Sequence, residues 1–165
     1  MQVFTAYSSM PKRLDITLPS PSDLGFDEPD FTGYWRNKSH CPDKSGSYLV
    51  WIYLKHNTRL AKPTKCILSP GWYVYAGSAN GPGGLRARLS RHLAKDKSRR
   101  WHIDQLTTKA THRYGWAWMN ACECALITHL QALPNFHHPV SGFGSSDCQQ
   151  CQSHLLKWSE LTTET

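Results

Sequence analysis

The sequence predicts an α+β domain built on a small central antiparallel sheet of three strands flanked by helices. Three runs rich in aromatic and branched residues, at 48–54, 72–76 and 113–119, have the composition of strands. Two other segments, 85–94 and 123–130, place apolar residues at helical spacing. With 165 residues, the chain is long enough for one domain with a buried core.

The part of the chain before the first strand is irregular in composition. Residues 1–45 are rich in Pro, Ser and Asp and show no sustained period, which is typical of irregular chain. We expect an irregular N-terminal arm here, with a short ordered piece around 31–35, and assign it no chemistry. Residues 46–158 are expected to form the domain, and residues 159–165 a C-terminal tail.

The first two strands place tyrosines on one face of the predicted sheet. Tyr48 begins the first strand, and Tyr73 and Tyr75 share a face of the second. Tyr48 and Tyr75 can face each other on adjacent antiparallel strands. The alternative is an ordinary cross-strand aromatic pair, which stabilises a sheet by ~0.2–1 kcal/mol. Tyr73 competes with Tyr75 for a role in a site.

A glycine-rich turn then leads into the first predicted helix. Gly77 and the 81–84 cluster Gly-Pro-Gly-Gly end the strand. Leucines recur at i, i+4 and i+8 from Leu85, which predicts an apolar stripe packed on the sheet. Arg88 and His92 stack one turn apart along the edge of this stripe, where a side chain is held firmly and still reaches a ligand.

Positive charge is concentrated just after this turn. The net charge of the chain is +7, and the segment 86–100 holds seven cationic residues against the single acid Asp96. A solvated face is the plain alternative, but a one-signed excess beside a glycine turn favours a polyanionic partner, with nucleic acid first. The candidates for substrate binding are Arg86, Arg91, Lys95, Lys97, Arg99 and Arg100.

Two further segments follow in the predicted domain. The residues 101–104, Trp-His-Ile-Asp, are predicted to begin a second helix. His102 and Asp104 do not share a helical face, and Asp104 is interpreted as a cap or an arginine partner. In the third strand, 113–119, Tyr and Trp residues alternate onto one face, which favours buried core over a platform for stacked bases.

Glu123 is the most informative carboxylate. It is the only Glu between Glu28 and Glu160, and it shares the inward face of a helix with apolar residues three, four and seven positions later. A charge directed at a core costs several kcal/mol unless it is paired or binds a metal. An ion pair with Arg88 or a position at the helix start is the alternative. The scarcity of acids in a basic segment favours ligation of Mg²⁺ or Mn²⁺.

The six cysteines suggest a second kind of site. The spacing Cys148-x₂-Cys151-x₂-His154 supplies three ligands for a structural zinc ion. The fourth would come from Cys41, Cys66, His137 or His138. No apolar run approaches ~18 residues and no signal peptide is evident, so we expect a cytoplasmic protein without a membrane span, in which disulfides are disfavoured.

Taken in order, these segments resemble a known superfamily. Gly46-Ser47-Tyr48, then Tyr75-Ala76-Gly77-Ser78, then Arg88 and His92 are similar to the GIY-YIG nuclease signature. The fuller set resembles one little-characterised branch of that superfamily, named only as a domain of unknown function. It adds Gly-Pro-Gly-Gly-Leu, Trp-His-Ile-Asp, a Glu at a helix start and Phe-Gly-Ser-Ser-Asp-Cys, and it runs from about residue 46 to residue 158.

The resemblance implies the α+β fold described above and a metal-dependent endonuclease that acts on DNA, or on RNA, by in-line attack of water and leaves a 5′-phosphate. It implies one Mg²⁺ or Mn²⁺ ion held by Glu123, with Tyr48 as the general base or a relay to it. Tyr75 would hydrogen-bond the attacking water, and Asp147 is a candidate for the Asn that such domains often carry late. The implied catalytic residues are Tyr48, Tyr75, Arg88, His92, His102 and Glu123.

In this scheme Arg88 would neutralise charge on the scissile phosphate, while His92 and His102 would position the phosphate or the water. Two alternatives stay open at this point. One is a non-catalytic nucleic-acid-binding module on the same fold. The other is a zinc-stabilised interaction domain in which the tyrosines, Arg88 and Glu123 belong to the core and the surface.

Overall fold

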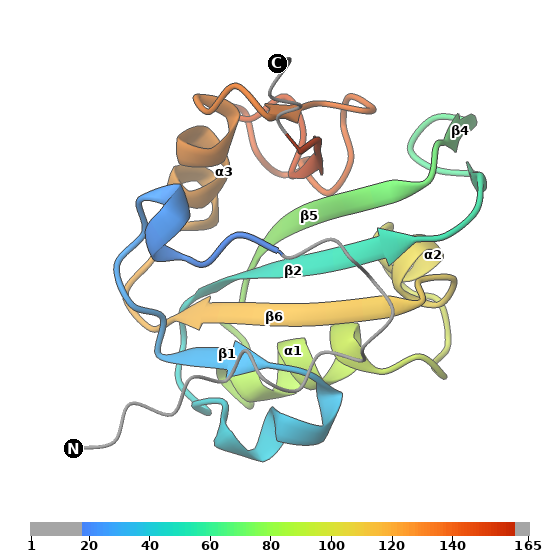
Figure 1. The fold of residues 1–165 in the computed structure, drawn as a ribbon. Helices are drawn as coiled ribbons and strands as arrows, with labels where there is room; N and C mark the ends of the chain where they lie inside the picture. Colours follow the sequence, from blue (N-terminus) through green and yellow to red (C-terminus); the bar gives the residue numbers. More distant parts are fainter. Residues whose placement is uncertain (1–17, 161–165) are drawn as a thin grey trace.

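A six-stranded antiparallel sheet runs through the molecule in the strand order β1-β6-β2-β5-β8-β7 (Figure 1). The computed structural model describes residues 18–160, so that residues 1–17 of the expected arm and 161–165 of the expected tail lie outside it. The strands of this sheet are β1 (Phe31–Gly33), β2 (Ser47–Leu54), β5 (Gly71–Ser78), β6 (His112–Trp118), β7 (Phe136–His137) and β8 (Leu155–Trp158). A separate two-stranded sheet pairs β3 (Thr58–Leu60) with β4 (Cys66–Leu68).

The prediction of a three-stranded sheet is therefore wrong. The three expected strands lie side by side as β6, β2 and β5, but β1 pairs with β6 on one side, and β8 and β7 extend the sheet beyond β5. Strands β1 and β7 have three and two residues, too few to show a period. In β8, Leu155 and Leu156 are buried against opposite sides of the sheet, so this strand does not alternate between apolar and polar residues.

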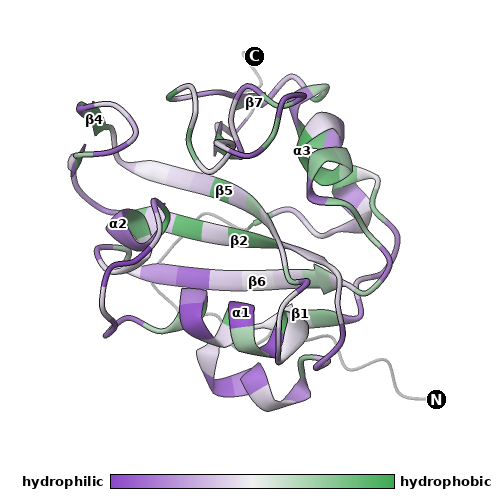
Figure 2. Cartoon of the chain, turned by 180° about the vertical axis from the view of Figure 1, so that it is seen from behind, coloured by the Kyte–Doolittle hydropathy of each residue, from purple (hydrophilic) through white to green (hydrophobic). Residues whose placement is uncertain are grey.

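Helices cover both faces of the sheet. Helix α1 (Gly84–Leu93) and the short α2 (Asp104–Thr107) pack on one face, and α3 (Glu123–Gln131) packs on the other (Figure 1). In the part of the chain that the structure describes, the short 3₁₀ helices η2 (Ser22–Leu24) and η3 (Trp35–His40) precede β2. Figure 2 shows hydrophilic residues on α1, whereas β2, above β6 in this view, is hydrophobic or neutral along its length. No helix within residues 18–160 is long and apolar enough to cross a membrane.

The sheet is buried on both sides, and its strands alternate between two cores. Val50 and Ile52 of β2 pack with α1, whereas Trp51 packs with Trp116 of β6 and with α3. The three aromatic residues of β6 that were expected to share one face, Tyr114, Trp116 and Trp118, are all buried. The prediction that they form core is confirmed, and they are not a surface for stacking bases.

The start of α1 is tied to the segment that precedes β2. The backbone N–H of Leu85 donates to the carbonyl of Lys44, and that of Arg86 donates to Pro42, both at 2.9 Å. Gly84 lies at φ +53°, and a Cβ there would collide with the Lys44 carbonyl, so the close approach requires glycine. Because these helix-terminal amides already have carbonyl partners, the turn is not a ready seat for an anion.

Candidate active site

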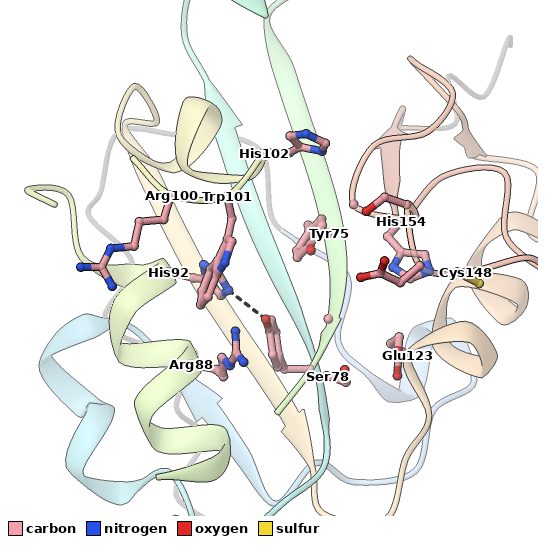
Figure 3. Close-up of a pocket in the computed structure, with 15 residues that line it drawn as sticks. Tyr75, Ser78, Arg88, His92, Arg100, Trp101, His102, Glu123, Cys148 and His154 are labelled. Atoms are coloured by element: carbon pink, nitrogen blue, oxygen red, sulfur yellow. Dashed lines mark hydrogen bonds between the residues drawn. The ribbon is translucent and has the colours of Figure 1, made fainter. Parts of the chain in front are cut away.

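All six predicted catalytic residues line a single cavity. The cavity has a volume of about 430 Å³ and opens beside β2 and β5 (Figure 3). The six residues come from β2, β5, α1, the segment before α2 and the first turn of α3. They are Tyr48, Tyr75, Arg88, His92, His102 and Glu123. Side chains scattered over 76 positions of the sequence therefore meet in one place, as expected.

The deepest part of the cavity is a hydrogen-bonded pair. Tyr48 Oη lies 2.8 Å from His92 Nε2, a contact drawn as the dashed line at His92 in Figure 3. The two side chains are almost fully buried, at 2% and 1% exposed. Burial, with a contribution from nearby Lys97, lowers the pKa of His92 to about 3. Burial also raises the pKa of Tyr48 well above its usual value. The pair is thus neutral, and we assign the Tyr48 hydroxyl as donor to Nε2, since a protonated phenol donates more strongly than it accepts.

The second tyrosine of the cavity is Tyr75. Burial raises its pKa to about 12, although the charge of Arg88 opposes the shift, so the phenol is protonated at neutral pH. Gly144, at φ +67°, lies against the ring, and a Cβ at this position would come within 2.6 Å of it. Tyr73 is 1% exposed and donates its hydroxyl to the Ser69 carbonyl at 2.7 Å, outside the cavity.

Arg88 and Trp101 form one side of the cavity. The guanidinium of Arg88 lies 4.5 Å from the centre of the Trp101 ring, and this tryptophan is 38% exposed. Within residues 18–160, Arg88 makes no ion pair with a carboxylate. The Arg88 guanidinium is therefore available to an anion that enters the cavity.

His102 is half-buried and lies beside Phe143, with 5.8 Å between ring centres.

Glu123 faces Arg88 across the cavity (Figure 3) and is the first residue of α3. Leu126, Ile127 and Leu130 are buried, which confirms the predicted inward face of the helix. The Glu123 carboxylate accepts one long hydrogen bond, 3.4 Å, from the Ser47 hydroxyl, and in the described chain it has no cationic partner. The alternative of an ion pair with Arg88 is thus not realised, and the carboxylate stays available to a cation.

The cations predicted to bind substrate do not all reach the cavity. Arg100 lines it, whereas Arg99 lines a separate depression near β3 and β4, and Lys95 is exposed on the same connecting segment. The other three make contacts within the protein. Arg86 Nε donates to the Cys41 carbonyl at 2.8 Å, Arg91 pairs with Asp104 at 2.6 Å, and Lys97 Nζ donates to the carbonyls of Arg91 and His92.

Asp104 is the partner of an arginine, which was one of the two interpretations of its position in the sequence. It is fully buried and accepts hydrogen bonds from Arg91 and from the backbone N–H groups of Arg100 and Trp101. The Lys97 ammonium lies 3.7 Å away, and burial lowers the pKa of this lysine to about 8. Asp104 therefore fixes the segment that carries Arg100, Trp101 and His102 to the cavity, and it does not line the cavity itself.

A cluster of metal-ligating side chains adjoins the cavity. Cys124, Cys148, Cys151 and His154 place their ligand atoms within 4.8 Å of one another, an arrangement that can hold a metal ion. The structure thus brings together the three ligands predicted from the sequence. The prediction of the fourth is wrong, because Cys41, Cys66, His137 and His138 all lie outside the cluster.

One feature of the sequence points to the fourth ligand: Cys124 directly follows Glu123, a predicted site residue at a helix start. Cys124 is 24 positions from Cys148, however, so the short spacing that identifies the other three ligands does not include it.

Hydrogen bonds within the cluster converge on Cys148. The backbone N–H of Cys151 donates to Cys148 Sγ at 3.3 Å. Hydrogen bonds to this sulfur, led by the N–H of Gln150, lower the pKa of Cys148 to about 6. Cys148 and His154 also line the cavity, as do Ser78, Trp101, Ser146 and Asp147.

The fold and the site define a mixed α/β domain with one cavity beside a Cys₃His cluster. The cavity combines a carboxylate, a buried tyrosine–histidine pair and an arginine that forms no ion pair within residues 18–160. Residues 47–165 match the family model of DUF123, a domain of unknown function. The match covers well over half of the chain, which therefore belongs to this family. No curated protein and no solved structure matches the chain.

Proposed function

We propose that the protein is a metal-dependent endonuclease of the GIY-YIG type that hydrolyses phosphodiester bonds in nucleic acid, with DNA as the preferred substrate. The observation that carries the proposal is the meeting of Tyr48, Arg88 and Glu123 in one cavity, from three elements far apart in the sequence. Such a cavity offers a proton path, a cation and a ligand for a divalent ion, which are the parts that phosphodiester hydrolysis needs.

The residues present fit a single Mg²⁺ or Mn²⁺ ion. Mg²⁺ is usually bound by one or two carboxylates together with water and substrate phosphate oxygens. Glu123 supplies a carboxylate that has no cationic partner among the described residues, and the exposed Asp147 lines the same cavity. When bound, such an ion polarises the scissile phosphate and activates water for attack. The Cys₃His cluster has soft ligands and is unsuited to this role.

The Tyr48–His92 pair supplies the proton path. Tyr48 Oη takes the proton of the attacking water as its own hydroxyl proton moves to Nε2 of His92, so that one proton passes from water to the imidazole. This direction requires that His92 starts neutral, which its lowered pKa ensures. A phosphate anion in the cavity would favour the imidazolium and so oppose the effect of burial on the pKa of His92.

The remaining side chains hold and neutralise the phosphate. Arg88 makes charge-assisted hydrogen bonds to the scissile group, where negative charge grows during the reaction. Tyr75, protonated at neutral pH, donates a hydrogen bond to the attacking water or a phosphate oxygen. His102 positions the phosphate from the segment before α2. Arg100, with Lys95 and Arg99, attracts the flanking nucleic-acid backbone.

A cleavage assay tests the proposal. Wild-type protein is incubated with single-stranded, duplex and branched DNA in Mg²⁺ or Mn²⁺. Cleavage that falls by about 10²-fold or more in Glu123→Gln and in Arg88→Ala supports the enzyme. Glu28→Gln and Arg59→Ala are matched controls, since both residues are exposed and lie outside the cavity.

Two outcomes of the assay contradict parts of the proposal. If Glu123→Gln and Arg88→Ala cut as fast as wild type, the cavity is not where the reaction occurs. If nothing is cut but DNA binds in a strongly salt-dependent way, the protein is a non-catalytic nucleic-acid-binding module instead.

A further inference from the structure

The Cys₃His cluster connects two parts of the chain that no strand pairing joins. Cys124 lies in the first turn of α3, whereas Cys148, Cys151 and His154 belong to the segment that leads into β8. Cys124 Sγ lies 3.4 Å from Cys148 Sγ, and all four ligand atoms fall within 4.8 Å of one another. Ligands bound at about 2.0–2.3 Å around one tetrahedral ion lie roughly 3.3–3.8 Å apart. The cluster therefore needs only a small contraction to enclose an ion.

The chemistry of the ligands selects the ion. Three sulfurs and one imidazole in a tetrahedral set suit Zn²⁺, whereas hard cations prefer oxygen ligands. All four positions come from the protein, which is the composition of a structural site and not of a site that keeps a place for substrate. The N–H of Cys151 that donates to Cys148 Sγ is the kind of contact that stabilises a metal-bound thiolate.

His154 gives a second, independent indication of a ligand. The residue is only 5% exposed, yet its Nε2 has no hydrogen-bond partner among the described residues. Its backbone is fixed on both sides, since its N–H donates to the Phe143 carbonyl and its carbonyl accepts from the N–H of Ala76. A buried imidazole nitrogen without a partner is costly unless something binds it. A metal ion bound at this nitrogen would remove the cost.

The segment between the ligands has little else to hold it. From residue 146 to residue 152, every side chain is exposed or half-exposed. Its contacts are the packing of half-buried Cys151 against the core on the α3 side and a few hydrogen bonds, among them Gly142 N–H to the Gln152 carbonyl and Cys148 N–H to the Ser145 carbonyl. A segment without buried apolar side chains opens readily by itself. It nevertheless forms a wall of the cavity through Ser146, Asp147 and Cys148.

We propose that Cys124, Cys148, Cys151 and His154 bind one structural Zn²⁺ ion, which fastens this wall to the start of α3. The ion would set the distance between Asp147 in the wall and Glu123, the neighbour of the ligand Cys124. It would also hold Gly144 against the ring of Tyr75. The zinc site is distinct from the Mg²⁺ or Mn²⁺ site proposed above, and it stands whether or not the protein cleaves nucleic acid.

Zinc content measures the first part of the proposal. Wild-type protein, purified with a reductant from zinc-supplemented cells and freed of loose metal, is expected to hold one zinc per chain. Cys148→Ser and Cys124→Ser are expected to hold little. Cys122→Ser is the matched control, because Cys122 is exposed and adjacent to the cluster in sequence but not part of it, and it keeps the zinc. Replacement by Co²⁺ in wild-type protein is expected to give the absorption of a tetrahedral thiolate site, with no need for a folded variant.

Hydrogen exchange measures the second part. Removal of zinc with a chelator is expected to speed amide exchange in residues 145–152 about tenfold or more, while the amides of β2 stay protected. Reduced wild-type protein that takes up no more zinc than Cys148→Ser overturns the site. Exchange in residues 145–152 that is unchanged by zinc removal overturns its role in fastening the wall. Neither result depends on cleavage, so the zinc site and the nuclease can fail separately.

Discussion

Glu123 and Cys124 are consecutive residues, but their side chains serve two different sites. The Glu123 carboxylate lines the cavity opposite Arg88, and the Cys124 sulfur lies 3.4 Å from Cys148 in the Cys₃His cluster. The first turn of α3 therefore places a hard oxygen donor in the cavity and a soft sulfur donor in the cluster. The two can be separated by mutation at neighbouring positions.

Substitution at these two positions is expected to give opposite effects. Glu123→Gln removes the ionic carboxylate and keeps its shape, so cleavage of DNA should fall by about 10²-fold or more while the zinc content stays at the wild-type level. Cys124→Ser should lose the zinc. Cleavage rates with Mg²⁺ and metal analysis of the same preparations check both. Loss of zinc in Glu123→Gln would show that the two sites are not separate.

The tyrosines can be separated in the same way. Tyr48→Phe removes the hydroxyl that donates to His92 and should lower cleavage by about 10²-fold. Tyr73→Phe removes only the hydrogen bond to the Ser69 carbonyl, outside the cavity, and should cost about 1 kcal/mol of unfolding free energy with cleavage retained. Denaturant unfolding and initial rates measure the two effects. Equal loss of activity in both variants would contradict the assignment of Tyr48.

Burial of His92 makes the fold sensitive to acid. The pKa of His92 is about 3 in the folded protein, against about 6.5 in an unfolded chain. As the pH falls from about 6.5, the unfolded state takes up a proton that the folded state does not, and unfolding free energy drops by about 1.4 kcal/mol per pH unit. His92→Gln lacks this contribution.

The comparison of wild type with His92→Gln isolates the effect, because all other titrating groups are common to both proteins. Urea unfolding at pH 6.5 and pH 5.5, with zinc present, is expected to show a steeper loss of stability in wild type, by about 1 kcal/mol. Parallel pH dependence in the two proteins would mean that His92 is protonated in the fold or does not govern its acid stability.

Gly144 tests the contact between the loop and the sheet. Gly144→Ala places a methyl group against the Tyr75 ring at a backbone conformation, φ +67°, that alanine rarely adopts. We expect a loss of about 2–3 kcal/mol of stability together with reduced cleavage. Gly142→Ala is the matched control. It has a similar φ, +74°, but its Cβ meets only Pro63 at 3.9 Å, so it should lose about 1–2 kcal/mol and keep its activity.

The regular elements with a clear period were the ones that the sequence could predict. The leucines of α1, the apolar stripe of α3 and the alternating aromatic residues of β6 each point to a face that the fold buries. The six cavity residues were located because their ordered set resembles a known signature. Tyr48 and Tyr75 lie on different strands, but the signature depends on the order of its residues along the chain, which the sequence shows.

The sequence could not predict features that depend on pairing across long distances. β8 is a strand because Leu155 and Lys157 pair with Tyr75 and Tyr73 of β5, which lie 80 and 84 positions earlier. The role of Cys124 as the fourth ligand depends likewise on where α3 meets the C-terminal segment. Arg91 and Lys97 were candidates for substrate binding because their charge is visible in the sequence, whereas their contacts with Asp104 are not.

The family match begins at residue 47, yet the carbonyls that accept the first amides of α1 belong to Pro42 and Lys44. Strand β1, which covers the outer edge of β6, lies earlier still. A fragment trimmed to the family boundary would leave those amides without their carbonyl partners and expose the unpaired margin of β6, inviting association between copies. The contacts that fix the start of α1, and with it the positions of Arg88 and His92, are thus made partly by residues outside the family match.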